Sequence, residues 1–270
     1  MSIQEAAMRK ILIAAHRGIA GGNIPCNSYP AFEGALRQGA DIIELDVSRS
    51  SDGVLYVFHP GMEPVFLGIQ PLLSELPSQE IDKLRLRNQD HVVTEYSIPR
   101  LRDTLEQLKG RCYINLDKFW SCPGDISALV RELGMQDQVI IKTGVSKENF
   151  DRVEELAPDL PYMAIVREND DATEELLRRK VRYIGVEALF TTEDAPVCQP
   201  EYLQSLRDCK LVAWANSIVY NYKAVLTAGH TDDVALGWDP DKGWGWLADR
   251  GFSIIQTDWP LMLRQYLAQR

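Results

Sequence analysis

Two carboxylates lie two positions apart in the apolar stretch "IIELDV". Side chains at positions i and i+2 of a β-strand point to the same side, so Glu44 and Asp46 project together while their apolar neighbours face the other way. Two like charges held this close repel each other, and a cation, a shared proton or exposure to water relieves the repulsion. Taken alone, the pair favours an edge strand with a solvated acidic face, so its surroundings must decide.

Polar residues also end several other apolar runs of the chain. In chain order these residues are His16, Arg17, His59, Asp117, Lys118, Trp214, Asn216 and Asp258. In a β/α barrel the chemistry lies at the carboxyl ends of the strands. If the runs are barrel strands, these side chains converge with Glu44 and Asp46 on one rim.

Each residue type at that rim has a plausible chemical task. Three oxygen donors, from Glu44, Asp46 and Asp117, suit a hard divalent cation such as Mg²⁺ or Ca²⁺. Arg17 and Lys118 add positive charge beside them, and a metal flanked by cations is a place for a phosphate group. The sequence therefore predicts a site for a metal ion and a phosphate.

Two histidines share the predicted rim. The ordinary pKa of histidine, near 6.5, lets one of the pair, His16 or His59, accept a proton while the other donates one. A single histidine at a strand end is more often a structural residue, and Asp258 fits a simple cap of the last helix. The joint occurrence of all these residues favours the functional interpretation.

The elements that would position these residues alternate along the chain. Helical patterns lie between most of the apolar runs, which is typical of β/α units around a parallel sheet. The candidate strands are 11–15, 42–47, 54–58, 112–117, 138–143, 162–166, 182–187, 211–215 and 253–257. The candidate helices are 30–38, 100–108, 124–133, 147–156, 171–180, 200–207 and 244–250. Nine runs compete for the eight strands of a barrel, so one is auxiliary.

The predicted fold is a TIM (β/α)8 barrel that occupies residues 1–270 as one domain. A length of 270 residues suits a barrel, and neither low-complexity tracts nor a break in composition divides the chain. Residues 60–98 form a long, proline-punctuated insertion after the third run, and residues 217–243 form a second excursion. Long connections inside compact domains are often functional.

Charge and cysteine content narrow the range of partners and compartments. Lys and Arg number 29 against 39 Asp and Glu, a net charge of −10 without a basic run, which argues against nucleic acid or an anionic membrane surface as partner. The five scattered cysteines form no C-x-x-C pair and suit a reduced cytoplasm. The first 18 residues carry only a short apolar run, so we expect neither a signal peptide nor a membrane span. The oligomeric state stays open.

Four segments, in order and spacing, carry a resemblance to a known family. They are "AHRGIAGGNIPCNSYPAFEGALRQGADIIELDVSRSSDGVLYVFHP", "IPRLRDTLEQLKGRCYINLDK", "WANS" and "RGFSIIQTDWP". Together they resemble the glycerophosphodiester phosphodiesterases over about residues 11–266. That family has a β/α barrel with an inserted segment after the third strand, which residues 60–98 resemble.

The resemblance implies a reaction and a role for each matched residue. It implies hydrolysis of a glycerophosphodiester to glycerol 3-phosphate and an alcohol, with Mg²⁺ or Ca²⁺, and a route through a cyclic phosphate is often considered for such enzymes. The small-molecule diester is then the partner. The implied metal ligands are Glu44, Asp46 and Asp117, the acid/base pair is His16 and His59, and the residues near the phosphate are Arg17, Lys118 and Asn27. We further expect Trp120 and Trp214, which lie near strand ends, to line the pocket for the alcohol.

The chain departs from the family pattern at three positions. Cys26 stands where the family usually has Glu, the shorter Asp117 replaces Glu, and Pro60 follows His59 in place of Asp. Glu63 could restore the missing carboxylate, although an ordinary loop residue is the better expectation. These departures keep open a catalytically impaired barrel that binds anionic ligands. The apolar stretch "PVFLGIQPLL" allows a further alternative, a phosphodiesterase for lipid headgroups with an exposed apolar rim in 60–98.

Overall fold

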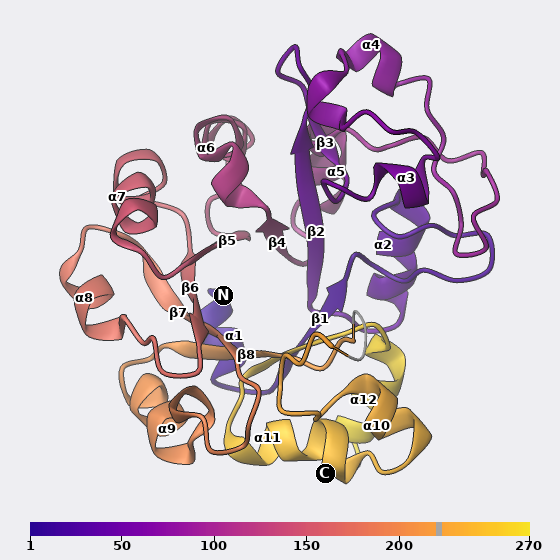
Figure 1. Cartoon of the computed structure of the whole chain (residues 1–270). Coiled ribbons are helices and arrows are strands. Elements are labelled where there is room, and N and C mark those ends of the chain that lie inside the picture. The colour runs from indigo at the N-terminus through magenta and orange to yellow at the C-terminus, as the bar shows by residue number, and fades with distance from the viewer. Residues whose placement is uncertain (220–222) are drawn as a thin grey trace.

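A closed barrel of eight parallel strands forms the centre of the molecule (Figure 1). The computed structural model describes residues 1–219 and 223–270. The strands around the barrel are β1 (Leu12–His16), β2 (Ile42–Arg49), β4 (Tyr113–Asp117), β5 (Val139–Gly144), β6 (Tyr162–Arg167), β7 (Tyr183–Leu189), β8 (Val212–Asn216) and β9 (Ile254–Thr257). Strand β1 pairs in parallel with both β2 and β9, which closes the ring. The predicted TIM barrel is confirmed.

The ninth apolar run lies outside the barrel. Strand β3 (Leu55–Val57) pairs antiparallel with the last three residues of β2, in the register Val47↔Val57 to Arg49↔Leu55. A tight turn with Gly53 at φ +91° reverses the chain between them, and glycine adopts that conformation without steric cost. The third predicted run is therefore the auxiliary one, and β4 is the third strand of the barrel itself.

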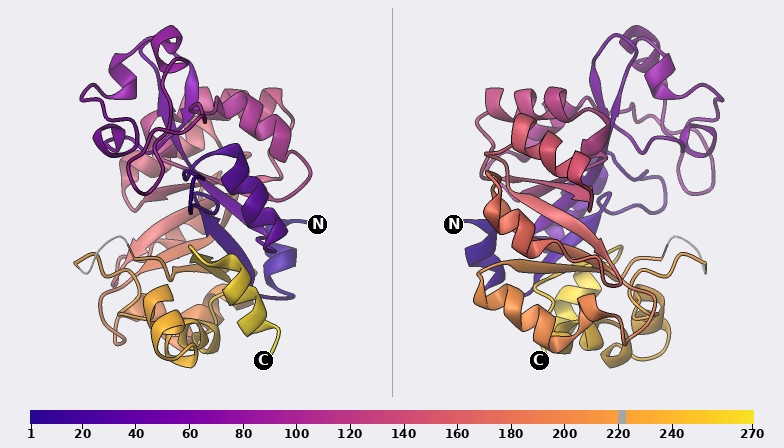
Figure 2. Two further views of the ribbon diagram at one scale, coloured as in Figure 1. Left: turned by 90° about the vertical axis from the view of Figure 1, so that its right-hand side faces the viewer. Right: turned by 60° about the vertical axis from the view of Figure 1, so that its left-hand side comes forward.

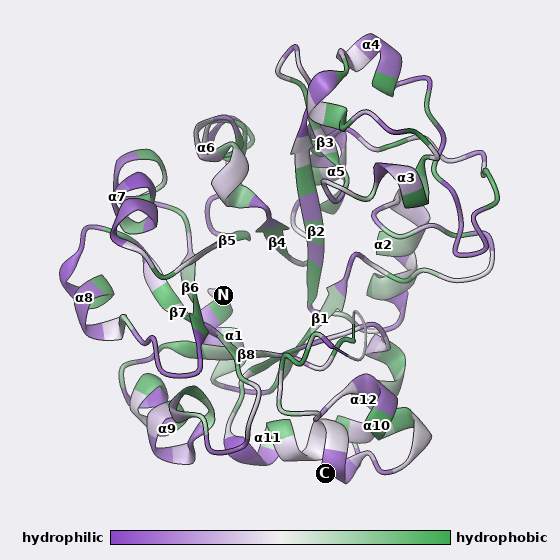
Figure 3. Ribbon diagram, viewed as in Figure 1, coloured by the Kyte–Doolittle hydropathy of each residue, from purple (hydrophilic) through white to green (hydrophobic). Residues whose placement is uncertain are grey.

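A ring of helices covers the outside of the barrel. They are α2 (Tyr29–Arg37), α5 (Leu101–Leu108), α6 (Pro123–Glu132), α7 (Lys147–Leu156), α8 (Thr173–Arg178), α9 (Pro200–Asp208), α11 (Trp246–Arg250) and α12 (Pro260–Leu267). Each predicted helix overlaps one of these elements, whereas α12 was not predicted. Apolar helix residues such as Phe32, Leu105 and Phe150 pack against the outward side chains of the strands. Figure 3 shows mixed colours on these helices and alternating bands on β2.

A short helix covers the amino-terminal end of the barrel. Helix α1 (Ile3–Ala7) begins with a capping box in which Ser2 and Glu5 bond each other's backbone N–H groups. Its residues Ile3, Ala6 and Ala7 pack with the inward apolar side chains of the strands. Since apolar side chains fill this end of the barrel, the polar residues of the predicted rim lie at the opposite end.

Residues 60–98, here called the inserted segment, stand on the side of the barrel away from α1 (Figure 2). The segment contains α3 (Glu63–Phe66), a 3-10 turn η1 (Leu73–Glu75) and α4 (Ser78–Ile81). Its apolar side chains pack with Tyr56 and Phe58 into a small hydrophobic core separate from the barrel. The large apolar side chains that it exposes include Leu72, Val92 and Val93.

The second excursion, residues 217–243, contains the helix α10 (Asp232–Gly237) and then joins the π-helical turn η4 (Asp241–Gly245). Residues 220–222 of this prediction lie outside the described residues. In the described part of the chain, no helix is both long enough and apolar enough to cross a membrane. All five cysteines are free thiols.

Candidate active site

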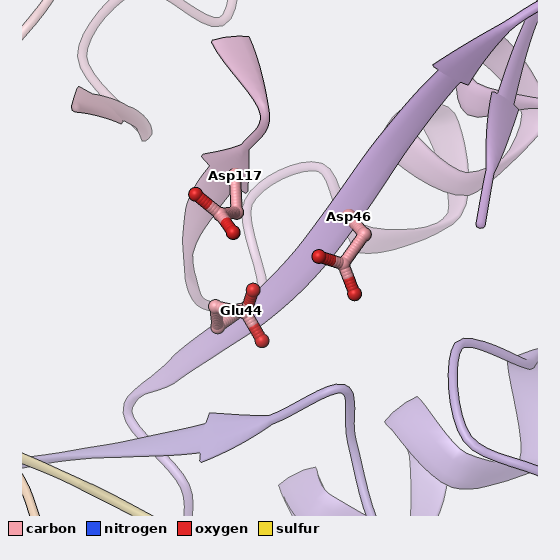
Figure 4. A group of neighbouring side chains, drawn as sticks. All are labelled: Glu44, Asp46 and Asp117. Atoms are coloured by element: carbon pink, nitrogen blue, oxygen red, sulfur yellow. The ribbon is translucent and has the colours of Figure 1, made fainter. Parts of the chain in front are cut away.

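Three carboxylates meet at the carboxyl end of two neighbouring strands (Figure 4). Glu44 and Asp46 come from one face of β2, and Asp117 ends β4, where the strand register pairs it with Asp46. One oxygen from each residue can be chosen such that all three lie within 4.8 Å of one another. The structure thus brings together the three predicted metal ligands.

The surroundings of the carboxylates favour a bound cation. Glu44 and Asp46 are 4% and 1% exposed. Burial, together with the charge of Asp46, raises the pKa of Glu44 to about 7. The buried Oδ1 atom of Asp46 accepts no hydrogen bond from the residues that the structure describes. Three crowded oxygen donors and an unsatisfied carboxylate oxygen fit Mg²⁺ or Ca²⁺ well.

The segment after β1 holds these carboxylates from one side. The backbone N–H of Arg17 donates to Oε2 of Glu44 at 3.0 Å, and its Nε lies 2.9 Å from Oδ2 of Asp46. The Asn27 side chain also donates to that Oδ2, at 2.9 Å. Arg17 and Asn27 have φ values of +56° and +54°, an uncommon conformation that aims both at the acidic pair. Gly18 is required between them because a Cβ there would lie 2.7 Å from the Ala31 carbonyl carbon.

Lys118 holds the third carboxylate. Its Nζ lies 2.6 Å from Oδ2 of Asp117 and 3.8 Å from Oδ1 of Asp46. Burial alone would raise the pKa of Asp117, but the Lys118 ammonium lowers it below its ordinary value. With Arg17, Lys118 places two positive charges beside the acidic group, as predicted for a phosphate site.

His16 is oriented by a carboxylate from the last strand. Its Nδ1 lies 2.8 Å from Oδ1 of Asp258, so a proton exchange with substrate would use Nε2. Burial alone would lower the pKa of His16, but Asp258 and Glu44 raise it above 6.5. Asp258 is fixed in turn because its backbone N–H donates to Asp232 of α10 at 2.9 Å. Helix α12 has no side-chain cap, so the alternative role of Asp258 as a helix cap is wrong.

His59 is oriented by Pro60, one of the three residues that depart from the family pattern. Its Nδ1 lies 2.8 Å from the Pro60 carbonyl, which can only accept, so Nδ1 carries the proton and Nε2 is the basic nitrogen. That Nε2 lies 3.9 Å from Oδ1 of Asp46. Burial, together with the charges of Arg17 and Lys118, lowers the pKa of His59 although Asp46 opposes the shift.

A cavity of about 180 Å³ lies in the mouth of the barrel between the carboxylates and the opposite strands. Its far wall carries a buried ion pair in which Lys142 Nζ of β5 lies 2.9 Å from Oε2 of Glu187 of β7. Burial lowers the pKa of Lys142. The ammonium lies 3.2 Å from the ring centroid of Trp214, and Asn216 donates to Glu187 at 2.6 Å. Trp214 is fully buried behind Lys142, whereas Trp120 lines the cavity.

The structure also shows where Cys26, another departure from the family pattern, and Glu63, the possible substitute for the missing carboxylate, lie. Cys26 lines a second cavity beside His16, and burial raises the pKa of its thiol to about 11, so it is a neutral group there. Glu63 is buried in the inserted segment, where its Oε1 accepts from the backbone N–H of Leu73 at 3.0 Å. The grouping of three carboxylates includes neither residue.

Polar residues that sequence reasoning missed around these cavities include Arg87, Asn115, Lys142 and Glu187. Asn115 lies two positions before Asp117, so the i, i+2 rule used for β2 identifies it as well. Lys142 and Glu187 are charges inside apolar runs, which is also a usable signal. Arg87 offers no local signal, because its place depends on how the inserted segment folds.

Comparisons with known proteins agree on one family. The model of the glycerophosphoryl diester phosphodiesterase family matches residues 16–212, and a model described as a domain of unknown function matches residues 162–267. A glycerophosphodiester phosphodiesterase of Bacillus altitudinis is 30% identical over 140 residues, which are 48% of this chain and 57% of that protein.

Solved structures share the whole fold. A glycerophosphoryl diester phosphodiesterase of Parabacteroides distasonis superimposes with a TM-score of 0.80 at 18% identity, over 100% of this chain and 93% of that one. An Oleispira antarctica phosphodiesterase in complex with the product sn-glycerol-3-phosphate has a TM-score of 0.70 at 17% identity, over 98% and 99% of the two chains.

Proposed function

The chain belongs to the glycerophosphoryl diester phosphodiesterase family, and on that premise we propose that it hydrolyses glycerophosphodiesters to glycerol 3-phosphate and an alcohol. The observation that carries the proposal is the convergence of three carboxylates, two cations and two oriented histidines on one rim of the barrel. Such a set can bind a phosphodiester, accept a proton from the attacking oxygen and donate one to the leaving alcohol oxygen.

Each group has one task in the proposed reaction. Nε2 of His59 removes the proton from the attacking oxygen, and Nε2 of His16 donates a proton to the leaving alcohol oxygen. Arg17 and Lys118 stabilise the charge that grows on the phosphoryl oxygens. Glu44, Asp46 and Asp117 hold a divalent cation, Mg²⁺ or Ca²⁺, which when bound polarises the phosphoryl group.

Hydrolysis assays test this assignment. We expect the purified protein to release glycerol 3-phosphate from glycerophosphoethanolamine, to lose activity in EDTA and to recover it with Mg²⁺ or Ca²⁺. The variants His16→Ala and His59→Ala should each lower kcat by about 10²- to 10⁴-fold. The control is His91→Ala, because His91 is exposed in the inserted segment and bonds only weakly to the Val65 carbonyl, at 3.4 Å.

Two outcomes would contradict the proposal. Unchanged turnover in both histidine variants would remove the acid/base assignment. Binding of glycerophosphodiesters without turnover under any divalent cation would instead support the impaired barrel. This test depends neither on where the protein is located nor on its oligomeric state. A location in the cytoplasm stays a prediction from the sequence.

A further inference from the structure

A second cavity, of about 320 Å³, lies directly beside the proposed reaction centre. His16 and Arg17 form its inner wall, and Trp259 after β9 forms another side. The inserted segment supplies the outer wall with Phe66 and Arg87. Because His16 is the proposed proton donor to the leaving oxygen, a group attached to that oxygen has this cavity next to it.

The guanidinium of Arg87 packs against Gly68, which has no side chain and therefore leaves room for it. A Cβ on Gly68 would lie 2.0 Å from Nη2 of Arg87 and 2.2 Å from Cζ. Gly68 also has φ +73°, which other residues rarely adopt. A glycine is therefore required for the observed position of the Arg87 side chain.

Backbone contacts fix Arg87 further. Its N–H donates to the Phe66 carbonyl at 2.8 Å. The neighbouring Asn88 donates from its side chain to that of Asn23 at 3.0 Å, which ties the inserted segment to the loop after β1. The backbone of Arg87 is thus held within the inserted segment, and this segment is tied to the loop after β1.

The charges around the cavity leave Arg87 available. Arg17 is paired with Asp46, and Asp258, the acidic residue of the wall, is paired with His16. The buried Nε of Arg87 donates to none of the residues that the structure describes. A buried guanidinium nitrogen without an acceptor is costly, and a carboxylate or phosphate is the partner that matches its geometry.

We propose that this cavity holds the leaving alcohol and that Arg87 selects substrates whose alcohol carries an anionic group, a carboxylate or a second phosphate. The inference rests on the proposed function. Glycerol is uncharged, so an anionic group bound at Arg87 belongs to the other end of the diester. The inserted segment then determines specificity while the barrel performs the chemistry.

Matched pairs of substrates test the proposal. Glycerophosphoserine differs from glycerophosphoethanolamine by one carboxylate, and glycerophosphoglycerol phosphate differs from glycerophosphoglycerol by one phosphate. We expect kcat/KM to be about 10- to 100-fold higher for the anionic member of at least one pair, as a charge-assisted hydrogen bond provides. The pair that shows the preference identifies the anionic group.

Variants of the inserted segment separate selection from catalysis. Arg87→Gln should remove the preference by lowering kcat/KM for the anionic substrate to that of its counterpart, and Gly68→Ala should do the same by displacing the guanidinium. Arg85→Gln is the matched control, because the exposed Arg85 bonds only the Asp82 and Leu84 carbonyls and should keep the preference. An unchanged preference in Arg87→Gln would overturn the proposal.

Calorimetry distinguishes failure of this inference from failure of the proposed function. In the His59→Ala background, glycerophosphoserine or glycerophosphoglycerol phosphate should bind more tightly than the counterpart that lacks the anionic group, and Arg87→Gln should abolish the difference. Tighter binding without turnover in the parent protein would support Arg87 and contradict the proposed reaction. Turnover or binding without any preference for the anionic substrates would overturn the role of Arg87 alone.

Discussion

The two histidines differ in their surroundings, and their pKa values are shifted in opposite directions. Asp258 accepts a hydrogen bond from His16, whereas a neutral carbonyl accepts one from His59. Burial lowers the pKa of His16, but Asp258 and Glu44 outweigh burial and raise it. Burial, with the charges of Arg17 and Lys118, lowers the pKa of His59. At a pH near 6.5 His16 is mainly protonated and His59 mainly neutral, as acid and base require.

NMR titration of the metal-free protein checks these directions. We expect the imidazole of His16 to titrate above pH 6.5 and that of His59 below it. In Asp258→Asn the pKa of His16 should fall, because the carboxylate that favours the protonated ring is gone. The reverse order of titration, or an unchanged His16 in this variant, would contradict the assignment.

At the scale of single residues, the sequence predicts the carboxylates on the barrel strands better than the arginine of the inserted segment. The i, i+2 spacing places Glu44 and Asp46 on one face, and the strand register then brings Asp117 beside them. Arg87 was not predictable, because its neighbour Gly68 and its cavity partner His16 come from distant segments.

At the scale of the element, one glycine determines how closely two barrel strands approach. Gly185 in β7 has φ +151°, and a Cβ there would lie 1.9 Å from the Val212 carbonyl oxygen of β8. This contact cannot relax without separating the strands, because the Cβ is fixed to the backbone of β7 and the Val212 oxygen belongs to the backbone of β8.

The variant Gly185→Ala should therefore lower the free energy of unfolding by about 4 kcal/mol or more. Urea denaturation measures this loss. The control Gly124→Ala, in α6 with no atom within 4 Å of its Cβ, should leave stability unchanged or raise it by up to about 1 kcal/mol. Equal destabilisation by both substitutions would show that the strand contact is not limiting.

The ion pair between β5 and β7 gives a second prediction for the elements. Lys142→Met leaves the Glu187 carboxylate without its cation in the barrel mouth and should destabilise the protein by about 3 kcal/mol. Thermal denaturation checks it. The double variant Lys142→Met/Glu187→Leu should recover most of the loss, because no uncompensated charge remains; a loss as large as that of the single variant would refute this reason.

The sequence predicts most of the barrel elements and misses those that depend on tertiary contacts. Each of the nine apolar runs became a strand with ends shifted by at most two residues, because buried parallel strands read as short apolar runs. The antiparallel partner of β2 could not be told from a barrel strand, since β3 is just as apolar. Helices α1 and α10 are too short to show a helical period.

At the scale of the whole molecule, the site should couple cation binding to stability. Removing the repulsion among buried carboxylates favours the folded state, and a cation at 100 times its Kd adds about 2.7 kcal/mol. We expect Mg²⁺ or Ca²⁺ to raise the Tm of the protein, and Asp46→Asn to abolish most of that increase. A similar increase in the variant would place the cation elsewhere.

The inserted segment is joined to the barrel through β2 and β3 and has a hydrophobic core of its own. A substitution there can therefore reshape one wall of the second cavity without disturbing the packing of the eight parallel strands. Evolution, or a protein engineer, could exchange this segment between relatives and redirect the choice of diester at little risk to folding. The pairing of β3 with the end of β2 is thus a junction at which the segment of one relative could replace that of another.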